Sequence, residues 1–285
     1  MKKILITGQN SYLGQSLAEW LAAEPENFSI KTISMRDDSW KKQSFSGYDL
    51  VFHVAGIAHT SSKAKLEDLY YRVNRDLALE TAEKAKKDGV KQFIFISSIL
   101  VYGNSGQEII TVNTEPQPSN FYGKSKYQAE QAINKLASPD FKVAVLRPPM
   151  IYGKNSKGNY QKLSKLVKKA PLFPLLENQR SMLHVDNFCQ FVKLIIINQE
   201  AGLFFPQNKD YVQTSQMVEE IAQIHGKKIK LTRIFNPLIK IMQGNRIIKK
   251  LFGSLVYEKS MSYYDKGDYQ IRGFKESIEL SEKED

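Results

Sequence analysis

The stretch KKILITGQNSYLG, residues 2–14, decides the fold of this chain. It begins as an apolar run typical of a buried strand, turns through a short loop and enters a helical pattern that continues to residue 23. Such a strand–loop–helix unit lets the backbone approach a pyrophosphate, which then sits at the helix N-terminus. Gly8 and Gly14 hold the outer positions of a G-x-x-G-x-x-G loop, and the small Ser11 takes the middle one, where its hydroxyl can cap the helix or contact phosphate. We therefore expect a dinucleotide-binding loop made by Gly8, Asn10, Ser11, Tyr12, Leu13 and Gly14.

The same alternation of strand and helix continues through the first half of the chain. Short runs rich in Val, Ile, Leu and Phe predict strands at 2–7, 28–35, 48–56, 91–98 and 142–148, and helical patterns lie between them at 12–23, 74–89 and 122–137. Near-continuous apolar strands separated by helices indicate a parallel sheet that is buried on both faces. The predicted fold class is therefore α/β, a doubly wound, Rossmann-type parallel sheet.

The character of the sequence changes after the two prolines at 148–149. The segment beyond residue 150 is less regular and richer in Lys, Pro and Asn, which indicates a smaller C-terminal substrate-binding region. The predicted division assigns residues 1–150, plus about 183–200, to a dinucleotide-binding domain, and residues 151–182 and 201–285 to the substrate-binding region.

Bulk composition excludes several classes of protein. With 285 residues, 42% hydrophobic and 25% charged, the chain matches a soluble globular protein with a sizeable core. Its one cysteine, Cys189, excludes a disulfide framework and a cysteine-built metal site, so we expect no metal. The first apolar run is too short for a signal peptide, and no run approaches the roughly 18 apolar residues of a membrane span. A cytoplasmic protein without a membrane span is therefore expected.

The net charge of +11 and the pI near 9.4 point to nucleic acid, an anionic membrane or a phosphorylated small molecule as possible partners. No nucleic-acid-binding motif accompanies the charge, so we expect no nucleic-acid partner and assign most of the charge to a lysine-rich, solvated surface. Lys and Arg concentrate at 154–169 and 227–250, where part of the charge can face an anionic ligand.

A basic amphipathic stretch, FNPLIKIMQGNRIIKKLFG, occupies residues 235–253. It mixes Ile, Leu, Met and Phe with Lys and Arg at helical spacing, which is compatible with a helix lying on an anionic membrane. Such an apolar stripe more often packs against its own domain, and packing is the interpretation that the sequence favours.

A second motif lies in FYGKSKYQAE, residues 121–130. At helical spacing Tyr122 and Lys126 share one face, which brings a phenol beside an ammonium. Tyr-x-x-x-Lys is common by chance, so it gains meaning only from the rest of the chain. Upstream of it, SSILVYG (97–103) closes the fourth expected strand and carries Ser98.

Taken together, these motifs resemble the extended short-chain dehydrogenase/reductase family, and more narrowly its NAD-dependent epimerase/dehydratase group, which includes enzymes similar to UDP-glucose/UDP-galactose 4-epimerase. Further matching pieces are VFHVAG (51–56), VN (73–74), LRPPMIYG (146–153) and RSMLHVDNF (180–188). The resemblance runs from residue 2 to about residue 200 in the family's order, and the remainder carries no matching motif.

The resemblance implies a catalytic trio of Ser98, Tyr122 and Lys126. A free tyrosine has a pKa near 10 and is a poor base at neutral pH, whereas a nearby ammonium favours the phenolate. Tyr122 would take a proton from a sugar hydroxyl, Lys126 would lower the phenol pKa and bind the nicotinamide ribose, and Ser98 would hold the substrate hydroxyl. Ser97 is a rival of the same type, but Ser98 is the residue that directly precedes the family's x-x-Val-Tyr-Gly pattern.

Cofactor contacts are also expected where the second and third strands end. NAD-binding folds usually place an acid at the end of strand two for the ribose hydroxyls. Here that place falls at Ser34, and Arg36 follows, which slightly favours NADP over NAD because an arginine can bind the 2′-phosphate. Ribose binding by Asp37 from a loop is the alternative. After the third strand, we expect the backbone of Val54, Ala55 and Gly56 to run past the adenine and pyrophosphate.

On the substrate side, the resemblance implies roles for two residues. Arg180 precedes a His-Val pair by the family's spacing and is expected to reach a diphosphate, for which its bidentate fork is suited. Asn159, in the stretch MIYGKNSKGNYQK (150–162), can meet the same diphosphate, although an exposed basic loop is an equal alternative. Three other polar residues are expected to be structural: His53, Asn74 and His184.

One departure from the family narrows the reaction. The family's 4,6-dehydratases place Asp-Glu directly after the catalytic Ser or Thr, whereas this chain has Ile99 and Leu100, which cannot move a proton. A UDP-sugar 4-epimerase is therefore expected, with an NADPH-dependent nucleotide-sugar 4-ketoreductase or dehydrogenase as the alternative. A non-catalytic dinucleotide-binding regulator is an alternative of another class. The resemblance also allows a homodimer, for which the residues themselves give no independent reason.

Overall fold

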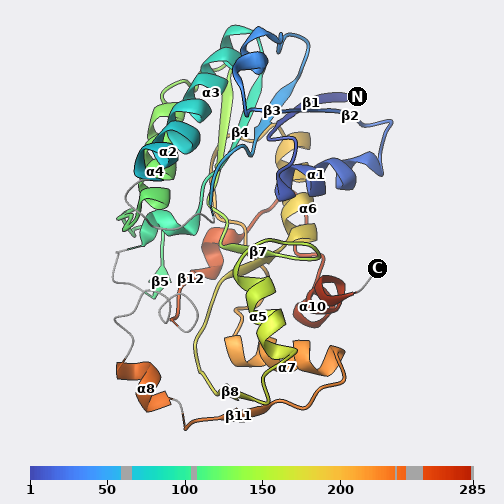
Figure 1. The fold of residues 1–285 in the computed structure, drawn as a ribbon. Helices are drawn as coiled ribbons and strands as arrows, with labels where there is room; N and C mark the ends of the chain where they lie inside the picture. The colour runs from blue at the N-terminus through green and yellow to red at the C-terminus, as the bar shows by residue number, and fades with distance from the viewer. Residues whose placement is uncertain (59–65, 104–107, 235, 242–252, 284–285) are drawn as a thin grey trace.

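The computed structural model describes residues 1–58, 66–103, 108–234, 236–241 and 253–283. Its centre is a six-stranded sheet of order β10-β6-β4-β3-β1-β2, in which every neighbouring pair is parallel (Figure 1). The strands are β1 (Lys2–Thr7), β2 (Phe28–Ile33), β3 (Leu50–His53), β4 (Gln92–Ile96), β6 (Lys142–Leu146) and β10 (Gly202–Phe204). The chain runs outward from β1 to β2 and then returns to the other side of β1, so the predicted doubly wound parallel sheet is confirmed, with its switch point between β1 and β3.

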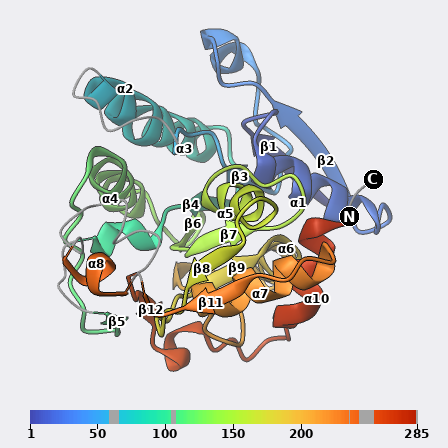
Figure 2. The ribbon, with the colours of Figure 1, turned by 60° about the horizontal axis from the view of Figure 1, so that its bottom comes forward.

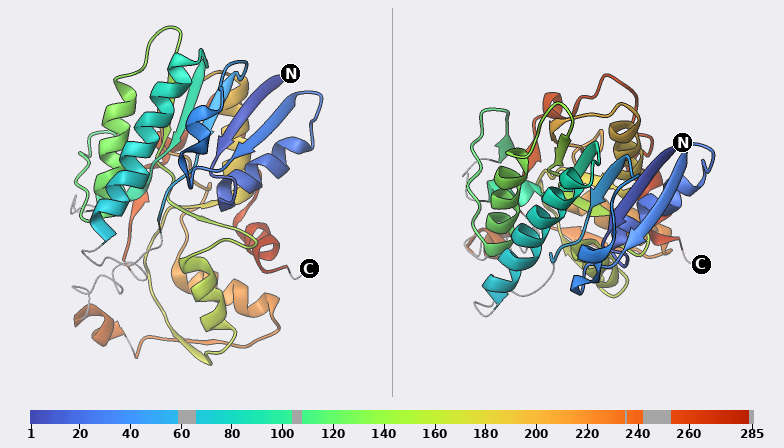
Figure 3. Two further views of the ribbon diagram at one scale, coloured as in Figure 1. Left: turned by 45° about the horizontal axis from the view of Figure 1, so that its top comes forward. Right: turned by 90° about the horizontal axis from the view of Figure 1, so that it is seen from above.

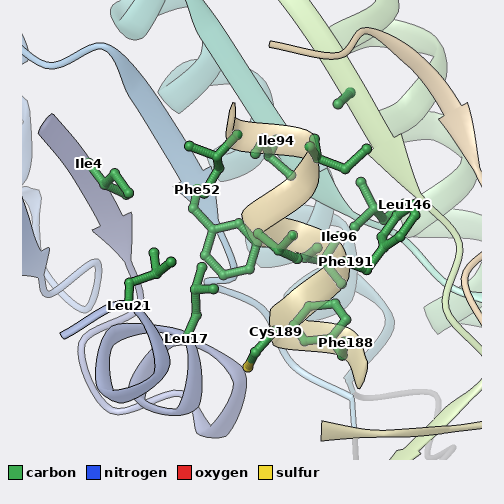
Figure 4. Close-up of a cluster of buried hydrophobic side chains, with 14 of the residues drawn as sticks. Ile4, Leu17, Leu21, Phe52, Ile94, Ile96, Leu146, Phe188, Cys189 and Phe191 are labelled. Carbon is green, nitrogen blue, oxygen red and sulfur yellow. The ribbon is translucent and has the colours of Figure 1, made fainter. Parts of the chain in front are cut away.

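One face of the sheet is covered by α1 (Tyr12–Ala22) and α6 (Val185–Ile197). Figure 4 shows Ile4 of β1 and Phe52 of β3 directed toward the side chains of these two helices, among them Leu17 of α1 and Phe188 of α6. All four side chains are fully buried. Because neighbouring residues of a strand point to opposite faces, this layer accounts for every second apolar residue of the strands.

The opposite face is covered by α3 (Leu77–Lys87) and α4 (Phe121–Asn134), with the short α2 (Glu67–Tyr71) beside them (Figure 3). Small residues of α3, including Ala78, Ala82 and Ala85, pack against this side of the sheet. The sheet is thus apolar on both faces, which explains why its strands read as continuous apolar runs rather than as alternating ones.

The edge strand β10 was not predicted, and it extends the sheet to Phe204, beyond the expected boundary at about residue 200. It pairs in parallel with β6 through only three residues. The buried side chain of Gln92 supports this edge, because its Nε2 donates hydrogen bonds to the carbonyl oxygens of Ile195 and Glu200 (3.1 and 2.9 Å) and so ties the chain leaving α6 to the sheet.

The remaining described elements form a smaller part at the carboxyl ends of the strands (Figures 1 and 2). It contains three two-stranded parallel pairs, namely β7 (Met150–Tyr152) with β9 (Met182–His184), β8 (Leu172–Pro174) with β11 (Lys230–Thr232), and β5 (Ile109–Ile110) with β12 (Val256–Tyr257). Its helices are α5 (Asn159–Val167), α7 (Thr214–Ile224), α8 (Asn236–Ile241) and α10 (Phe274–Glu282). A separate apolar cluster, which includes Tyr160, Phe173, Met217 and Ile278, forms its core. This separate core accounts for the change of character that the sequence shows after residue 150.

Within the described ranges, no helix combines the length and the apolar character needed to cross a bilayer. Of the amphipathic stretch 235–253, the structure describes α8 and Gly253; residues 235 and 242–252 lie outside the described residues, and so does most of the predicted helix. The side chain of Ile241, at the end of α8, is 83% exposed, so this residue does not pack against its own domain.

Candidate active site

The loop between β1 and α1 has the shape that a pyrophosphate requires. Gly8 has φ +86°, a conformation that L side chains rarely adopt, and a Cβ there would come within 3.0 Å of the Ala55 nitrogen. The amides of Gly8 and Gln9 both donate to the Ile33 carbonyl oxygen at 3.0 Å, which fixes the turn. Ser11 caps α1, since its Oγ accepts a hydrogen bond from the Gly14 amide at 3.1 Å.

A second glycine lies beside Asn74 and Lys126. Gly56 follows β3, and a Cβ on it would lie 3.0 Å from Asn74 Oδ1 and 3.4 Å from Lys126 Nζ. Val54 and Ala55 border the loop, because a Cβ on Gly14 would come within 3.1 Å of Val54 Cγ2 and a Cβ on Gly8 within 3.0 Å of the Ala55 nitrogen. The residues present therefore fit a dinucleotide laid from the α1 N-terminus toward Lys126.

Ser98 and Tyr122 come together at the carboxyl edge of the sheet. Ser98 follows β4 and is 8% exposed, and its Oγ caps the short 3-10 helix Ile99–Tyr102 by accepting from the Leu100 amide at 3.2 Å. Tyr122 lies in the first turn of α4. Burial raises the pKa of Tyr122 to about 12, while the neighbouring Ser98 hydroxyl acts in the opposite direction. The two side chains are thus close enough for Ser98 to influence the phenol.

The rival serine is engaged elsewhere. The Ser97 hydroxyl donates a short hydrogen bond to the Glu130 carboxylate in the interior between β4 and α4. Successive residues at the end of β4 point in opposite directions, so only one of the two serines faces Tyr122. This geometry separates Ser98 from Ser97, which the sequence could do only by resemblance.

Lys126 is almost completely buried, with 5% of its surface exposed. Its Nζ donates to the Ile96 carbonyl oxygen at 2.9 Å and lies 4.7 Å from the centre of the Phe95 ring. Burial lowers the pKa of Lys126 to about 8, and the Glu130 carboxylate counteracts part of that shift. The sequence led us to expect that Lys126 lowers the pKa of Tyr122. Among the protein groups burial dominates instead, and the phenol pKa rises, so this expectation is corrected in its direction.

Asn74 lies in a π-helical turn, Arg72–Asp76, which joins α2 to α3. Its Oδ1 accepts from the Ile57 amide at 2.9 Å, and its Nδ2 donates to the Ile57 carbonyl oxygen at 3.0 Å and to Ser125 Oγ at 3.2 Å. The side chain therefore connects the segment after β3 to the helix that carries Tyr122. This agrees with the structural role expected of Asn74.

The end of β2 offers a serine and an arginine rather than an acid. Ser34 follows the strand directly, and its Oγ accepts from the Arg36 amide at 3.3 Å. Arg36 is exposed. The Asp37 side chain caps the 3-10 helix Asp38–Lys42 by accepting from the Ser39 amide at 2.9 Å, and hydrogen bonds to Ser39 lower the pKa of Asp37. Asp37 is therefore already engaged in capping.

Asn159 and Arg180 line one small cavity of about 30 Å³ together with Met150, Leu163, Met182, Val212, Thr214 and Met217. Arg180 is held by its backbone, which pairs with Val212, and by its Nη1, which donates to the Gly253 carbonyl oxygen at 3.0 Å. Burial lowers the pKa of Arg180. The two predicted substrate residues thus meet in the smaller part of the molecule.

A buried ion pair behind α4 was not predicted from the sequence. Glu130 on α4 and Arg147 after β6 are 2% and 6% exposed. Arg147 Nη2 lies 2.5 Å from Glu130 Oε2, and Arg147 Nη1 donates to Tyr102 Oη at 2.5 Å. The Tyr257 hydroxyl donates to the Arg147 carbonyl oxygen at 2.8 Å. A usable signal was present, because Tyr122, Lys126 and Glu130 repeat at four-residue spacing on one helix face.

Two buried histidines have structural surroundings. His53 Nδ1 lies 3.0 Å from Thr7 Oγ1, and burial lowers the pKa of His53 to about 3, so the ring is neutral at physiological pH. His184 caps α6 through the Asp186 amide, and burial lowers its pKa to about 4. Both residues serve packing and capping, as expected from the sequence.

A larger cavity, of about 330 Å³, lies between α5 and α10 and is lined by residues such as Tyr160, Lys168 and Glu282. None of the predicted catalytic or cofactor-binding residues lines it, so cavity size does not locate the chemistry here.

In the part of the chain that the structure describes, no group of three or more His, Cys, Asp or Glu residues could hold a metal ion.

Comparison with known proteins agrees with this geometry. The family model described as NAD dependent epimerase/dehydratase family matches residues 4–212. An N-acetyl-alpha-D-glucosaminyl-diphospho-ditrans,octacis-undecaprenol 4-epimerase of Escherichia coli O157:H7 is 29% identical over 257 residues, covering 82% of this chain and 76% of the relative. A UDP-glucose 4-epimerase of Vibrio cholerae is 29% identical over 246 residues, covering 78% of this chain and 75% of the relative.

Solved structures share the fold. The UDP-glucuronic acid 4-epimerase of Bacillus cereus, in complex with NAD, superposes with a TM-score of 0.75 at 15% identity, covering 98% of this chain and 97% of that one. The dTDP-4-dehydrorhamnose reductase of Bacillus anthracis, in complex with NADP, gives a TM-score of 0.69 at 23% identity, covering 81% of this chain and 83% of that one. At these identities the likeness speaks for the fold alone.

Proposed function

The chain belongs to the NAD dependent epimerase/dehydratase family, and from that membership we propose that it is a 4-epimerase acting on a UDP-linked hexose. It is an NAD(P)-dependent enzyme of the extended short-chain dehydrogenase/reductase type. The observation that carries the proposal is the placement of Tyr122 beside Ser98 at the carboxyl edge of the sheet, with Lys126 one helical turn further along α4. A phenol poised in this way suits proton transfer to and from a sugar hydroxyl.

In this mechanism Ser98 holds the substrate hydroxyl, and Tyr122 Oη removes its proton and later returns it. When bound, an oxidised nicotinamide supplies a hydride acceptor and a positive charge. Burial raises the pKa of Tyr122 to about 12, so the phenolate needs nearby positive charge, and Lys126 lies one helical turn away to contribute it. With a pKa of about 8, Lys126 is protonated at neutral pH and can donate hydrogen bonds to a ribose.

The absence of an acid after Ser98 argues against dehydration. Ile99 is 6% exposed and Leu100 packs against the same cluster, and neither side chain can accept or donate a proton. Hydride chemistry at C4 without elimination of a hydroxyl is the reaction that these side chains support.

The substrate side supports a sugar diphosphate. Arg180 can offer a bidentate fork to a diphosphate, and Asn159 lines the same cavity. By their names, the Vibrio relative acts on UDP-glucose and the Escherichia relative on a sugar joined through a diphosphate to undecaprenol. Both substrate classes present a diphosphate, and we place the UDP-linked sugar first and the polyprenol-linked sugar second.

A 4-ketoreductase is the alternative reaction, and the end of β2 favours it. Ser34 replaces the acid that usually binds the ribose hydroxyls of NAD, and the exposed Arg36 is available for the 2′-phosphate of NADP. Asp37 already caps the 3-10 helix Asp38–Lys42, so it is not free to bind the ribose hydroxyls of NAD, and this also favours NADP. A non-catalytic dinucleotide-binding regulator is the alternative of another class, and the complete Ser98–Tyr122–Lys126 trio argues against it.

The deciding experiment has two steps. The purified protein is denatured and the released nucleotide identified, and the intact protein is then incubated with UDP-glucose or UDP-N-acetylglucosamine without added cofactor while NMR follows inversion at C4. Retained NAD(H) with inversion supports the epimerase. If the protein turns over only a 4-keto sugar, and only with added NADPH, it is a ketoreductase and not an epimerase. Dinucleotide binding without turnover of either substrate supports the regulator. A cytoplasmic location and a homodimer belong to the same proposal, and cell fractionation and ultracentrifugation test them.

A further inference from the structure

The end of the molecule away from the six-stranded sheet exposes apolar side chains. There β8 pairs with β11, and β11 is followed by α8 (Figure 1); Figure 2 turns this end toward the viewer. Ile234 and Ile241 are 82% and 83% exposed, and Leu172 on β8 is 44% exposed. We call these three residues the apolar rim. Single exposed apolar residues are common on proteins, but two isoleucines this exposed, one just before α8 and one at its end, call for a partner.

The apolar rim is embedded in positive charge. Lys230 lies directly opposite Leu172 in the β8–β11 register, and Lys227 and Lys228, just before it in the chain, are exposed as well. Arg233 is exposed and pairs with Glu177 at 3.0 Å. In sequence, residues 227–250 contain eight Lys or Arg residues and no Asp or Glu, which is a large share of the net charge of +11.

We propose that the apolar rim and its lysines dock the protein on the surface of an anionic lipid bilayer. Exposed isoleucines can enter the boundary between headgroups and acyl chains, and flanking lysines are attracted by anionic headgroups. A second copy of the chain fits less well, because the same cluster of positive charge would face itself. Nucleic acid would satisfy the lysines but would leave the two isoleucines in water.

The docking surface is joined to the diphosphate site by short connections. The Leu175 amide donates to the Thr232 carbonyl oxygen, and Asn236 Nδ2 donates to the Leu175 carbonyl oxygen, each at 2.9 Å. Arg180 follows Leu175 within one extended segment of at most about 18 Å. Docking therefore brings the Arg180 side of the molecule close to the bilayer. If the second substrate class of the proposed function applies, a diphosphate anchored in the membrane by its lipid would lie within reach; the docking itself does not depend on that reaction.

The intact chain is tested by sedimentation with vesicles of phosphatidylcholine alone and with vesicles that also contain phosphatidylglycerol. We expect it to sediment with the anionic vesicles only, and to be largely released at about 1 M salt, where the Debye length falls to about 3 Å. Absence of sedimentation with anionic vesicles overturns the proposal. Equal sedimentation with both kinds of vesicle contradicts the role of the lysines.

Variants locate the contact. Ile234→Asn with Ile241→Asn should lower vesicle partition by more than tenfold, whereas Val112→Asn, which alters an apolar residue that is 74% exposed elsewhere, should not. Replacement of Lys227, Lys228 and Lys230 by Gln should lower it by about fivefold for each lysine, whereas Lys87→Gln on α3 should have little effect. Each variant should keep wild-type turnover of a soluble UDP-sugar, so loss of docking and failure of the proposed reaction are told apart. If the double isoleucine variant binds anionic vesicles as well as the wild type does, the bilayer is not the partner. The same conclusion follows if duplex DNA, added at an equal amount of negative charge, releases the protein from the vesicles.

Discussion

The Glu130 carboxylate lies 2.5 Å from the Arg147 guanidinium in the interior, one helical turn beyond Lys126. The pair fixes the helix of Tyr122 and Lys126 against β6, and removal of one partner leaves the other charged and buried. We expect Glu130→Gln to lower the free energy of unfolding by about 3–5 kcal/mol, measured by denaturant titration. Glu80→Gln, which breaks the half-exposed pair with Lys41, should cost about 1 kcal/mol or less. Equal losses in the two variants would show that Glu130 does not carry a buried charge pair.

Tyr122→Phe keeps the ring of the catalytic residue and removes its hydroxyl. If Tyr122 transfers the proton, kcat should fall by about 10²–10⁴-fold, while dinucleotide affinity stays near wild type. Tyr127→Phe removes a hydroxyl from the next turn of the same helix and should leave kcat almost unchanged. Steady-state kinetics and NAD(P)H fluorescence titration measure both quantities. Activity that survives in Tyr122→Phe would refute the proposed mechanism.

The buried Lys126 gives a pH dependence of defined sign. Burial lowers its pKa from 10.5 to about 8, so between these pH values the folded state binds fewer protons than the unfolded state and stability rises with pH. The wild type should therefore gain, relative to Lys126→Met, up to about 3 kcal/mol of unfolding free energy as the pH rises through this window. Over the same range loss of the ammonium should weaken dinucleotide binding. A difference between the two proteins that is independent of pH would show that Lys126 does not titrate there.

Arg180 is expected to hold the substrate diphosphate and not the reacting carbon. Arg180→Ala should raise KM for the sugar diphosphate by about 10–100-fold, as expected for loss of charged hydrogen bonds, with little change in kcat. Arg180→Lys should recover only part of the loss, because lysine lacks the bidentate fork. Arg233→Ala, which removes an exposed arginine paired with Glu177, is the matched control. An effect confined to kcat would place Arg180 in the chemical step.

A comparison of Gly8 with Gly47 distinguishes the effect of backbone strain from the effect of a close contact with neighbouring backbone. Both have positive φ, +86° and +84°, but a Cβ on Gly8 would meet the Ala55 backbone at 3.0 Å, whereas a Cβ on Gly47 would meet nothing within 4 Å. Gly47→Ala should cost about 1–2 kcal/mol of stability and leave dinucleotide affinity intact. Gly8→Ala should in addition weaken dinucleotide binding by more than tenfold. If the two alanines weakened binding equally, the close approach at Gly8 would have no bearing on the cofactor.

The sequence was sufficient for the strands and helices whose periodicity is long and regular. The strands β1, β2, β3, β4 and β6 and the helices α1, α3 and α4 lie where apolar periodicity predicted them. The edge strand β10 was missed because its three residues, partly exposed, carry no pattern, and tertiary pairing with β6 alone makes them a strand. The strand pairs of the smaller part are equally short, so long-range contacts define them.

The sequence predicted which residues form the candidate site, but not the contacts between their side chains or the burial of those side chains. The sequence identified Ser98, Tyr122 and Lys126, and the structure brings Ser98 close enough to Tyr122 to influence the phenol pKa. The direction of the phenol pKa could not be predicted, because it depends on burial by residues distant in sequence. Glu130 was missed because a glutamate in a polar helical stretch is normally solvated; its spacing from Tyr122 and Lys126 placed it on their face, and the structure adds its buried partner Arg147.

The wide turn at Arg72–Asp76 has a consequence for insertions and deletions in this chain. A π-helical turn contains one residue more than the α-helical turn that it replaces. Removal of a single residue there would restore ordinary helical hydrogen bonding, at little cost to the helix itself, and would rotate everything before it by about 100° relative to α3. Asn74 would then turn away from Ile57 and Ser125. A change that regularises the helix would thus remove the hydrogen bonds of Asn74 beside Lys126, and a length change at this turn is far less neutral than one in an exposed loop.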